Sequence, residues 1–131
     1  MSFNSDKFYR YINSQRDQLF KLGVFDCFIF VSNWILLSSG KVYFEQFKGK
    51  YKTKKGWMGL IKREGYENLE DLLNKNFTKK NINLASRGDI VLLNGECLGL
   101  CDGAYSVFLD ESDHYDYKHV ATCECDGVYG L

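Results

Sequence analysis

The chain has no hydrophobic run long enough to span a membrane. Its longest apolar stretch, residues 28–37, is interrupted by Ser32 and Asn33, and it falls short of the roughly 20 residues that a transmembrane helix needs. The N-terminus, residues 1–6, also lacks the basic and then apolar pattern of a secretory signal. These two absences predict a protein that is made in a cytoplasm and has no membrane partner.

The cysteines do not suit a secreted disulfide framework. The chain has five of them, an odd number, and no Cys-x-x-Cys pair, so reduced thiols are expected. Enough thiol and imidazole ligands for a tetrahedral zinc site are nevertheless present: Cys97, Cys101, His119, Cys123 and Cys125. Because the usual metal-binding spacing is missing, we expect neither a metal nor another cofactor.

The chain has no net charge, with 17 basic and 17 acidic residues, but its charges are unevenly distributed. Residues 48–63, here called the basic segment, contain lysine, arginine and aromatic residues but no acid. Such a stretch can bind phosphates, nucleic acid or an acidic partner. The candidate binding residues are Lys50, Tyr51, Lys52, Lys55 and Trp57. The alternative, which the neutral total charge favours, is a solvated loop that packs against the acidic C-terminal third.

The spacing of apolar residues changes from helical to strand-like near residue 85. Helices are predicted at 5–22, 26–39, 53–64 and 69–73, and the second should be central because apolar residues lie on nearly every side of it. Strands are predicted at 89–93, 96–100, 104–109, 118–124 and 128–131, with a hairpin turn at Asn94-Gly95. Helices followed by an antiparallel meander predict one α+β domain over residues 1–131.

A cysteine stands at the predicted start of the central helix. Gly23, Asp26 and Cys27 directly precede the apolar run, and the Asp26 carboxylate can accept N–H bonds in the first turn as a helix cap. The helix dipole favours an anion there, which increases the nucleophilic thiolate fraction of a cysteine. Cys27 is therefore a candidate nucleophile. The alternative is that Cys27 is only a small buried hydrophobic residue.

Several short motifs occur in an order that resembles an uncharacterised family of phage-encoded NlpC-like proteins. The similarity runs from about residue 22 to residue 100 and rests on Gly23-x-x-Asp26-Cys27, residues 47–53, Gly65, residues 87–91 and residues 98–100. The resemblance implies a papain-like fold, in which the cysteine-bearing helix packs on a C-terminal antiparallel sheet. It also implies a cell-wall cysteine peptidase or amidase, acting in the host cytoplasm or in a virion. Asp89 should hold a turn and take no part in catalysis.

Active NlpC-type enzymes have a general-base histidine that this sequence lacks at the corresponding position. Those enzymes begin the second strand with a His-Val-Gly-Ile-like sequence, whereas the corresponding run here begins with Cys97. A thiol cannot replace an imidazole that takes and returns a proton near neutral pH. The two histidines of the chain are His114, in an acidic loop, and His119, on a predicted strand. His119 is the candidate partner of Cys27.

Two classes of function follow. In the first, the protein is a cysteine hydrolase that cuts peptide-like amide bonds through a Cys27 thioester. In the second, the fold is kept without catalysis, as a virion tail component or an inhibitor of a host factor such as a defence complex. The missing histidine favours the second class, and the Asp26-Cys27 helix start favours the first. Nucleic acid binding through the basic segment is the least expected interaction.

Overall fold

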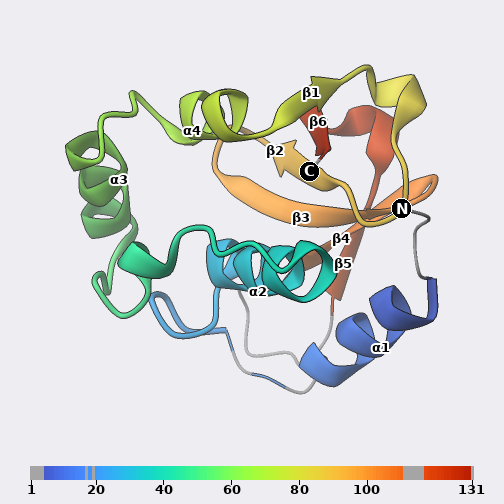
Figure 1. The fold of residues 1–131 in the computed structure, drawn as a ribbon, viewed down its shortest axis with the longest axis horizontal. Coiled ribbons are helices and arrows are strands. Elements are labelled where there is room, and N and C mark those ends of the chain that lie inside the picture. Colours follow the sequence, from blue (N-terminus) through green and yellow to red (C-terminus); the bar gives the residue numbers. More distant parts are fainter. Residues whose placement is uncertain (1–4, 17, 19, 111–116, 131) are drawn as a thin grey trace.

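A computed structural model describes residues 5–16, 18, 20–110 and 117–130 (Figure 1). Within these residues the chain forms four α-helices and one six-stranded sheet in which every pair of neighbouring strands is antiparallel. The predicted α+β class is therefore confirmed. No helix in this part of the chain is long and apolar enough to cross a membrane.

The helices and strands mostly follow the predicted order. The helices are α1 (Ser5–Gln15), α2 (Cys27–Ser39), α3 (Lys54–Arg63) and α4 (Leu69–Asn76), with short 3-10 turns η1 (Glu45–Phe47), η2 (Ile82–Leu84) and η3 (Thr122–Glu124). The strands are β1 (Thr78–Lys80), β2 (Ile90–Leu93), β3 (Cys97–Asp102), β4 (Tyr105–Leu109), β5 (Tyr117–Ala121) and β6 (Gly127–Gly130). They lie in the order β1-β6-β2-β3-β4-β5.

Two strand predictions need correction. Residues 78–80, a polar stretch for which no strand is predicted, form β1. Pairing with β6 satisfies their backbone N–H and C=O groups, and the local sequence gives no sign of this partner. The strand predicted at 118–124 ends at Ala121, where the chain turns into η3. The Asn94-Gly95 hairpin is confirmed between β2 and β3, and both residues have the positive φ of such a turn.

Helix α2 is the central helix, as its all-round apolar sequence predicts. It packs against β3 in the middle of the sheet (Figure 1), and the ring of Trp34 is almost fully buried. The indole Nε1 of Trp34 donates to the carbonyl oxygen of Gly88 at 2.9 Å. This hydrogen bond attaches the middle of α2 to the turn before β2.

The turn before β2 is held by Asp89. Its carboxylate accepts a hydrogen bond from the backbone N–H of Ser86 at 2.8 Å and lies 2.7 Å from the Lys80 ammonium. Lys80 lies on β1, so the same carboxylate also joins the edge of the sheet to this turn. The expected structural role of Asp89 is confirmed.

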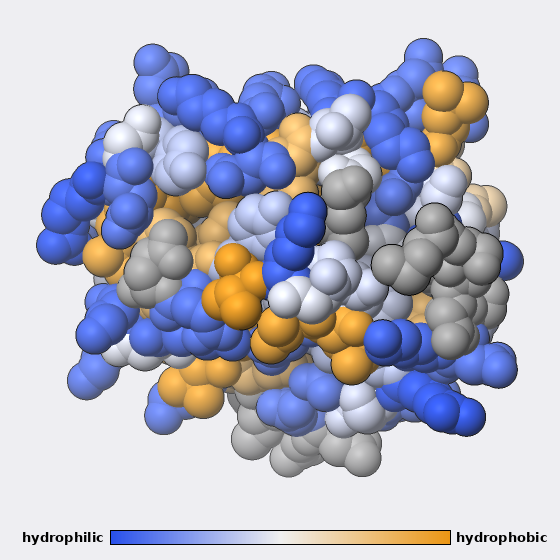
Figure 2. All heavy atoms as spheres, in the orientation of Figure 1, coloured by the Kyte–Doolittle hydropathy of each residue, from blue (hydrophilic) through white to orange (hydrophobic). Residues whose placement is uncertain are grey.

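The sheet buries side chains on both faces. The face toward the helices contributes to the main core with Ile90, Leu92, Leu98, Leu100, Val107 and Tyr129. The opposite face forms a smaller cluster from Val91, Cys101, Phe108, Cys125 and Val128. Hydrophilic side chains cover most of the outline of the molecule, and apolar groups gather near the middle of the visible face, over α2 (Figure 2).

Replacing Trp34 with Phe should lower the free energy of unfolding by about 1–3 kcal/mol, because the buried carbonyl group of Gly88 would lose its donor. Urea denaturation measures this loss. Trp57→Phe is the matched control, since the buried indole N–H of Trp57 has no acceptor among the described residues. Equal losses in the two variants would contradict the role given to the Trp34 hydrogen bond.

Candidate functional site

Asp26 builds the turn that brings Cys27 to the first position of α2. Its side chain is 2% exposed. One carboxylate oxygen, Oδ1, accepts from the backbone N–H of Ile29 at 2.9 Å, which confirms the predicted helix cap. The other, Oδ2, accepts from the backbone N–H of Gly23 at 2.9 Å and from the hydroxyl of Tyr51. Asp26 therefore fixes the loop before the helix as well as the helix start.

Tyr51 is part of this turn and not of an exposed binding surface. Its side chain is buried. Burial, and then the hydrogen bond to Asp26, raises the pKa of Tyr51 far above its ordinary value of 10.0. The hydroxyl thus stays protonated and donates at any ordinary pH. This corrects the expectation that Tyr51 is a contact residue of the basic segment.

Gly23 brings two of the sequence motifs into contact. Its φ of +81° lies in the left-handed region, and a Cβ atom at this position would lie 2.1 Å from the carbonyl oxygen of Tyr51. In addition, the backbone N–H of Gly49 donates to the carbonyl oxygen of Gly23 at 3.0 Å. The motifs at 23–27 and 47–53, far apart in the sequence, are therefore one structural unit.

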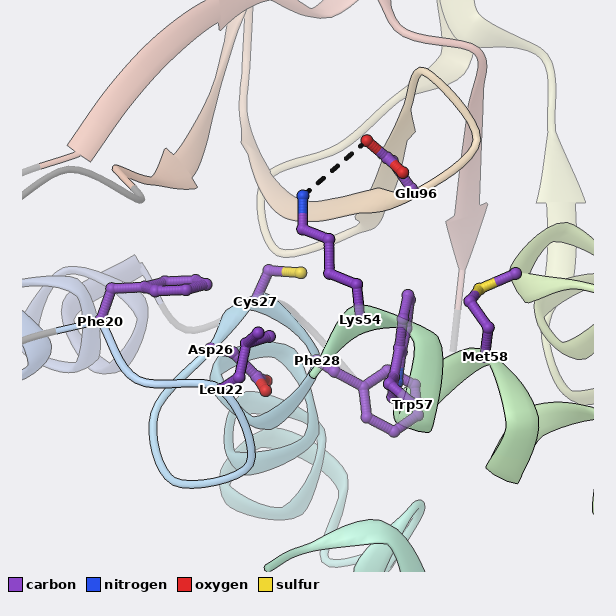
Figure 3. Close-up of a pocket in the computed structure, with 9 residues that line it drawn as sticks. All are labelled: Phe20, Leu22, Asp26, Cys27, Phe28, Lys54, Trp57, Met58 and Glu96. Atoms are coloured by element: carbon purple, nitrogen blue, oxygen red, sulfur yellow. Dashed lines mark ion pairs between the residues drawn. The ribbon is translucent and has the colours of Figure 1, made fainter. Parts of the chain in front are cut away.

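The half-buried thiol of Cys27 lies where two cavities meet. The smaller, of about 40 Å³, is lined by Phe20, Leu22, Asp26, Cys27, Phe28, Lys54, Trp57, Met58 and Glu96 (Figure 3). The larger, of about 230 Å³, shares Phe20, Cys27, Lys54 and Glu96 and continues along the sheet to Cys97, Phe108, Lys118 and Val120. We call the two cavities together the Cys27 groove.

Lys54 and Glu96 form an ion pair in the wall of this groove. The Lys54 Nζ and Glu96 Oε1 atoms are 4.0 Å apart, with side chains 50% and 57% exposed. Figure 3 shows the Lys54 side chain extending from the start of α3 past the Cys27 thiol toward Glu96. Sequence reasoning missed both residues as site residues, because no motif marks Glu96 and Lys54 is one of many lysines in its segment.

His119 does not line the Cys27 groove. Its strand neighbours Lys118 and Val120 do, and alternate side chains of a strand point to opposite faces. His119 shares its face with its cross-strand partner Val107 and is exposed. Val107 belongs to the face toward the helices, so the predicted pairing of His119 with Cys27 stays a prediction. His114 lies outside the described residues.

The other thiols fall into two groups. Cys97, at the position expected for the family's histidine, lines the groove together with Cys27. Cys101 and Cys125 are buried in the cluster on the far face of the sheet, and burial, followed by the charge of Asp126, raises the pKa of Cys125 to about 11. Cys123 is exposed. Within the described part of the chain, no group of three or more His, Cys, Asp or Glu side chains is placed to hold a metal ion.

The basic segment is divided between surface and core. Lys50, Lys52 and Lys55 are exposed, as the binding hypothesis requires, and hydrophilic side chains cover the side of the molecule formed by α3 (Figures 1 and 2). Trp57, however, is 6% exposed, and its ring packs edge-on against Phe28, with centroids 5.6 Å apart. The expectation of a basic surface with exposed aromatic rings is therefore corrected for Trp57 as well as for Tyr51.

Gly23→Ala should destabilise the protein more than Gly40→Ala. Both glycines have positive φ, but an added Cβ atom at Gly40 meets nothing within 4 Å. We expect about 1 kcal/mol of backbone strain at Gly40 and at least about 1 kcal/mol more at Gly23, from the contact with Tyr51. Urea denaturation of the two variants measures the difference, and similar losses would remove the Gly23–Tyr51 contact from this account.

Comparison with known proteins finds a family without an assigned function. A family model described as "Domain of unknown function (DUF6950)" matches residues 4–126. No curated protein and no solved structure matches the chain.

Proposed function

We propose that this chain, which belongs to the DUF6950 family, is an NlpC-like protein that uses Cys27 as a nucleophile against peptide-like amides. The observation that carries the proposal is the position of the Cys27 thiol. It is half-buried, it lies at the first residue of α2, and it lines a groove beside the Lys54 ammonium. A helix N-terminus and a neighbouring cation both favour the thiolate form of cysteine.

The arrangement of elements supports a papain-like fold. A cysteine-bearing helix, α2, packs on β3 of an antiparallel sheet, as the resemblance to NlpC-like proteins implies. The first turn of α2, with its capped start, lies at the end of the sheet where β3 begins, since Cys27 and Cys97 line the same cavity. A substrate bound along the groove would thus reach the thiol without displacing the core.

The chemistry proposed for the groove is acyl transfer to sulfur. The Cys27 thiolate attacks the carbonyl carbon of an amide and forms a tetrahedral adduct. The C–N bond of this adduct then breaks, the nitrogen takes up a proton and leaves as the amine, and the acyl group stays on sulfur as a thioester. Water then hydrolyses the thioester and returns the free cysteine. The groove combines apolar side chains, including Phe20, Leu22 and Phe108, with the charged side chains of Lys54, Glu96 and Lys118. This mixture suits a peptide substrate that has both apolar and charged groups.

A non-catalytic interaction protein is the second candidate. The observation that favours it is that no histidine of the described residues lines the Cys27 groove. A phage protein of this kind would bind a host or virion partner, and the exposed lysines of the basic segment would supply the contacts to an acidic one.

Cys27 should react with iodoacetamide near pH 7 faster than the other four thiols, because the helix start and Lys54 favour its thiolate. Cys123 is the internal control for the accessibility of a thiol to the reagent. It is exposed, but it lies in the short 3-10 turn η3 and not at the start of an α-helix. Peptide mass spectrometry after brief labelling measures the order. Labelling of Cys27 that is no faster than that of Cys123 would support a structural role for the Cys27 thiol.

Turnover separates the two candidate functions. Incubation with synthetic cell-wall stem peptides should yield cleaved product and a thioester adduct on Cys27, both detected by mass spectrometry. Cys27→Ser should lose both, whereas Cys123→Ser should lose neither. Cleavage that survives Cys27→Ser would overturn the proposed mechanism, and a parent protein that cleaves nothing would favour the interaction protein.

Charge reversal in the basic segment tests the interaction candidate. Lys50→Glu combined with Lys55→Glu should leave the fold and peptide cleavage unchanged, because both side chains are exposed and neither lines the groove. If the segment binds an acidic partner, the double variant should lose that binding, and salt should weaken binding by the parent, since exposed charges are screened beyond about 10 Å at 0.1 M ionic strength. Titration measures the affinity. An affinity that changes neither with the substitutions nor with salt would exclude the segment as an interface.

A further inference from the structure

We propose that Lys54 transfers the proton that a histidine transfers in active NlpC-type enzymes. Among the described residues, no histidine lines the groove. In this proposal the Lys54 ammonium stabilises the Cys27 thiolate and then protonates the leaving amine. The inference rests on the proposed function, because it requires Cys27 to act as a nucleophile.

The local structure holds Lys54 at the groove. Lys54 is the first residue of α3, directly after Thr53, whose hydroxyl caps the helix by accepting from the backbone N–H of Gly56 at 3.0 Å. Trp57, three residues later and so on the same side of the helix, is buried against Phe28 of α2. The packing of Trp57 therefore places Lys54 beside the first turn of α2, and Lys54 lines both cavities with Cys27 (Figure 3).

The charged and titratable side chains around Cys27 come from several elements. Those of the described residues that line the groove or contact its turn are Asp26, Tyr51, Lys54, Glu96, Cys97 and Lys118. The Asp26 carboxylate is committed to hydrogen bonds within the turn, and the Tyr51 hydroxyl donates to it. Lys54 and Lys118 are the cations of this set.

Of the two cations, Lys54 fits the role better. It lines both cavities, whereas Lys118 lines only the larger one. The Lys118 Nζ atom also lies 3.9 Å from Oδ1 of Asp110. The Lys54–Glu96 pair is long, at 4.0 Å, and both side chains are about half exposed. Such a pair is weak, so the ammonium can leave Glu96 and turn toward a thiolate or a leaving group.

Trp57, a residue in the wall of the smaller cavity, also has a donor for which no described residue supplies an acceptor. The indole N–H of Trp57 is buried and has no acceptor among these residues, and Trp57 lines the cavity with Cys27 and Lys54. Buried polar groups in proteins are nearly always hydrogen-bonded. The Trp57 N–H is one of two exceptions among the described residues, and its side chain forms part of the cavity wall.

The proposed cycle balances without any other co-reactant than water. The resting pair is a Cys27 thiolate and a Lys54 ammonium. As the S–C bond forms and the C–N bond breaks, Lys54 gives its proton to the leaving nitrogen and becomes a neutral amine. The neutral amine then takes a proton from the water that attacks the thioester, which releases the carboxylic acid and restores the thiolate and ammonium.

Two substitutions of Lys54 separate its charge from its proton transfer. Lys54→Gln removes both functions, so the pH midpoint of Cys27 alkylation by iodoacetamide should rise by on the order of one unit. Lys54→Arg keeps the charge but does not release a proton in this pH range, so the midpoint should stay near that of the parent. Cleavage of the stem peptide should fall by on the order of 100-fold in both variants.

An ester substrate tests the proton step directly. A p-nitrophenyl ester of the same acyl group has a leaving group that needs no proton, so the initial burst of p-nitrophenol should be near normal in Lys54→Arg. Lys79→Gln is the control, because Lys79 is a lysine of β1 that is exposed and does not line the groove. It should behave like the parent in all three assays.

The outcomes distinguish this inference from the proposed function. If Lys54→Gln leaves the alkylation midpoint and peptide cleavage unchanged while Cys27→Ser is inactive, the proposed function stands and the role of Lys54 is wrong. A shift produced by Lys118→Gln in place of Lys54→Gln would assign the role to the other cation and also overturn the proposal. If the parent cleaves no peptide, both the proposed function and the proton transfer fail. Circular dichroism melts check that each variant is folded.

Discussion

The buried carboxylate of Asp26 is the interaction on which the rest of the groove depends. A buried charge persists only where hydrogen bonds replace its hydration, and Asp26 obtains them from three different parts of the local chain. The same side chain thus starts α2, closes the loop at Gly23 and anchors Tyr51. Since Tyr51 leads within three residues to the start of α3, the carboxylate also sets where Lys54 stands relative to Cys27.

The features that could be predicted from the sequence are those set by local rules. A capping carboxylate before an apolar run marks the start of α2, and apolar residues on all sides mark it as the central helix. The hairpin at Asn94-Gly95 follows from the backbone geometry that these two residues tolerate. Each of these rules involves residues within a few positions of one another, so no knowledge of tertiary contacts is needed.

The features that the sequence does not determine depend on tertiary contacts. Tyr51 and Trp57 stand among lysines, which suggested a surface, yet their rings are buried against Asp26 and Phe28. The side of the sheet to which His119 points is set by its register with β4, and a shift of one residue would reverse it. Neither the burial of these rings nor that register can be obtained from the sequence of the segment alone.

The basic segment shows how one stretch of sequence acquires several roles. Its lysines cannot be told apart from the sequence alone. The burial of Trp57 fixes which side of α3 faces the core, and as a result Lys54 lines the smaller cavity and Lys55 does not. Both lysines are exposed, but Lys54 lines the groove with the half-buried thiol and Lys55 does not. A stretch that suggests a binding surface is therefore scaffold at Tyr51, groove wall at Trp57 and Lys54, and surface at Lys50, Lys52 and Lys55. If the segment matters to function, the groove residues and the surface lysines matter for different reasons, and substitutions in the two sets need not have the same effect.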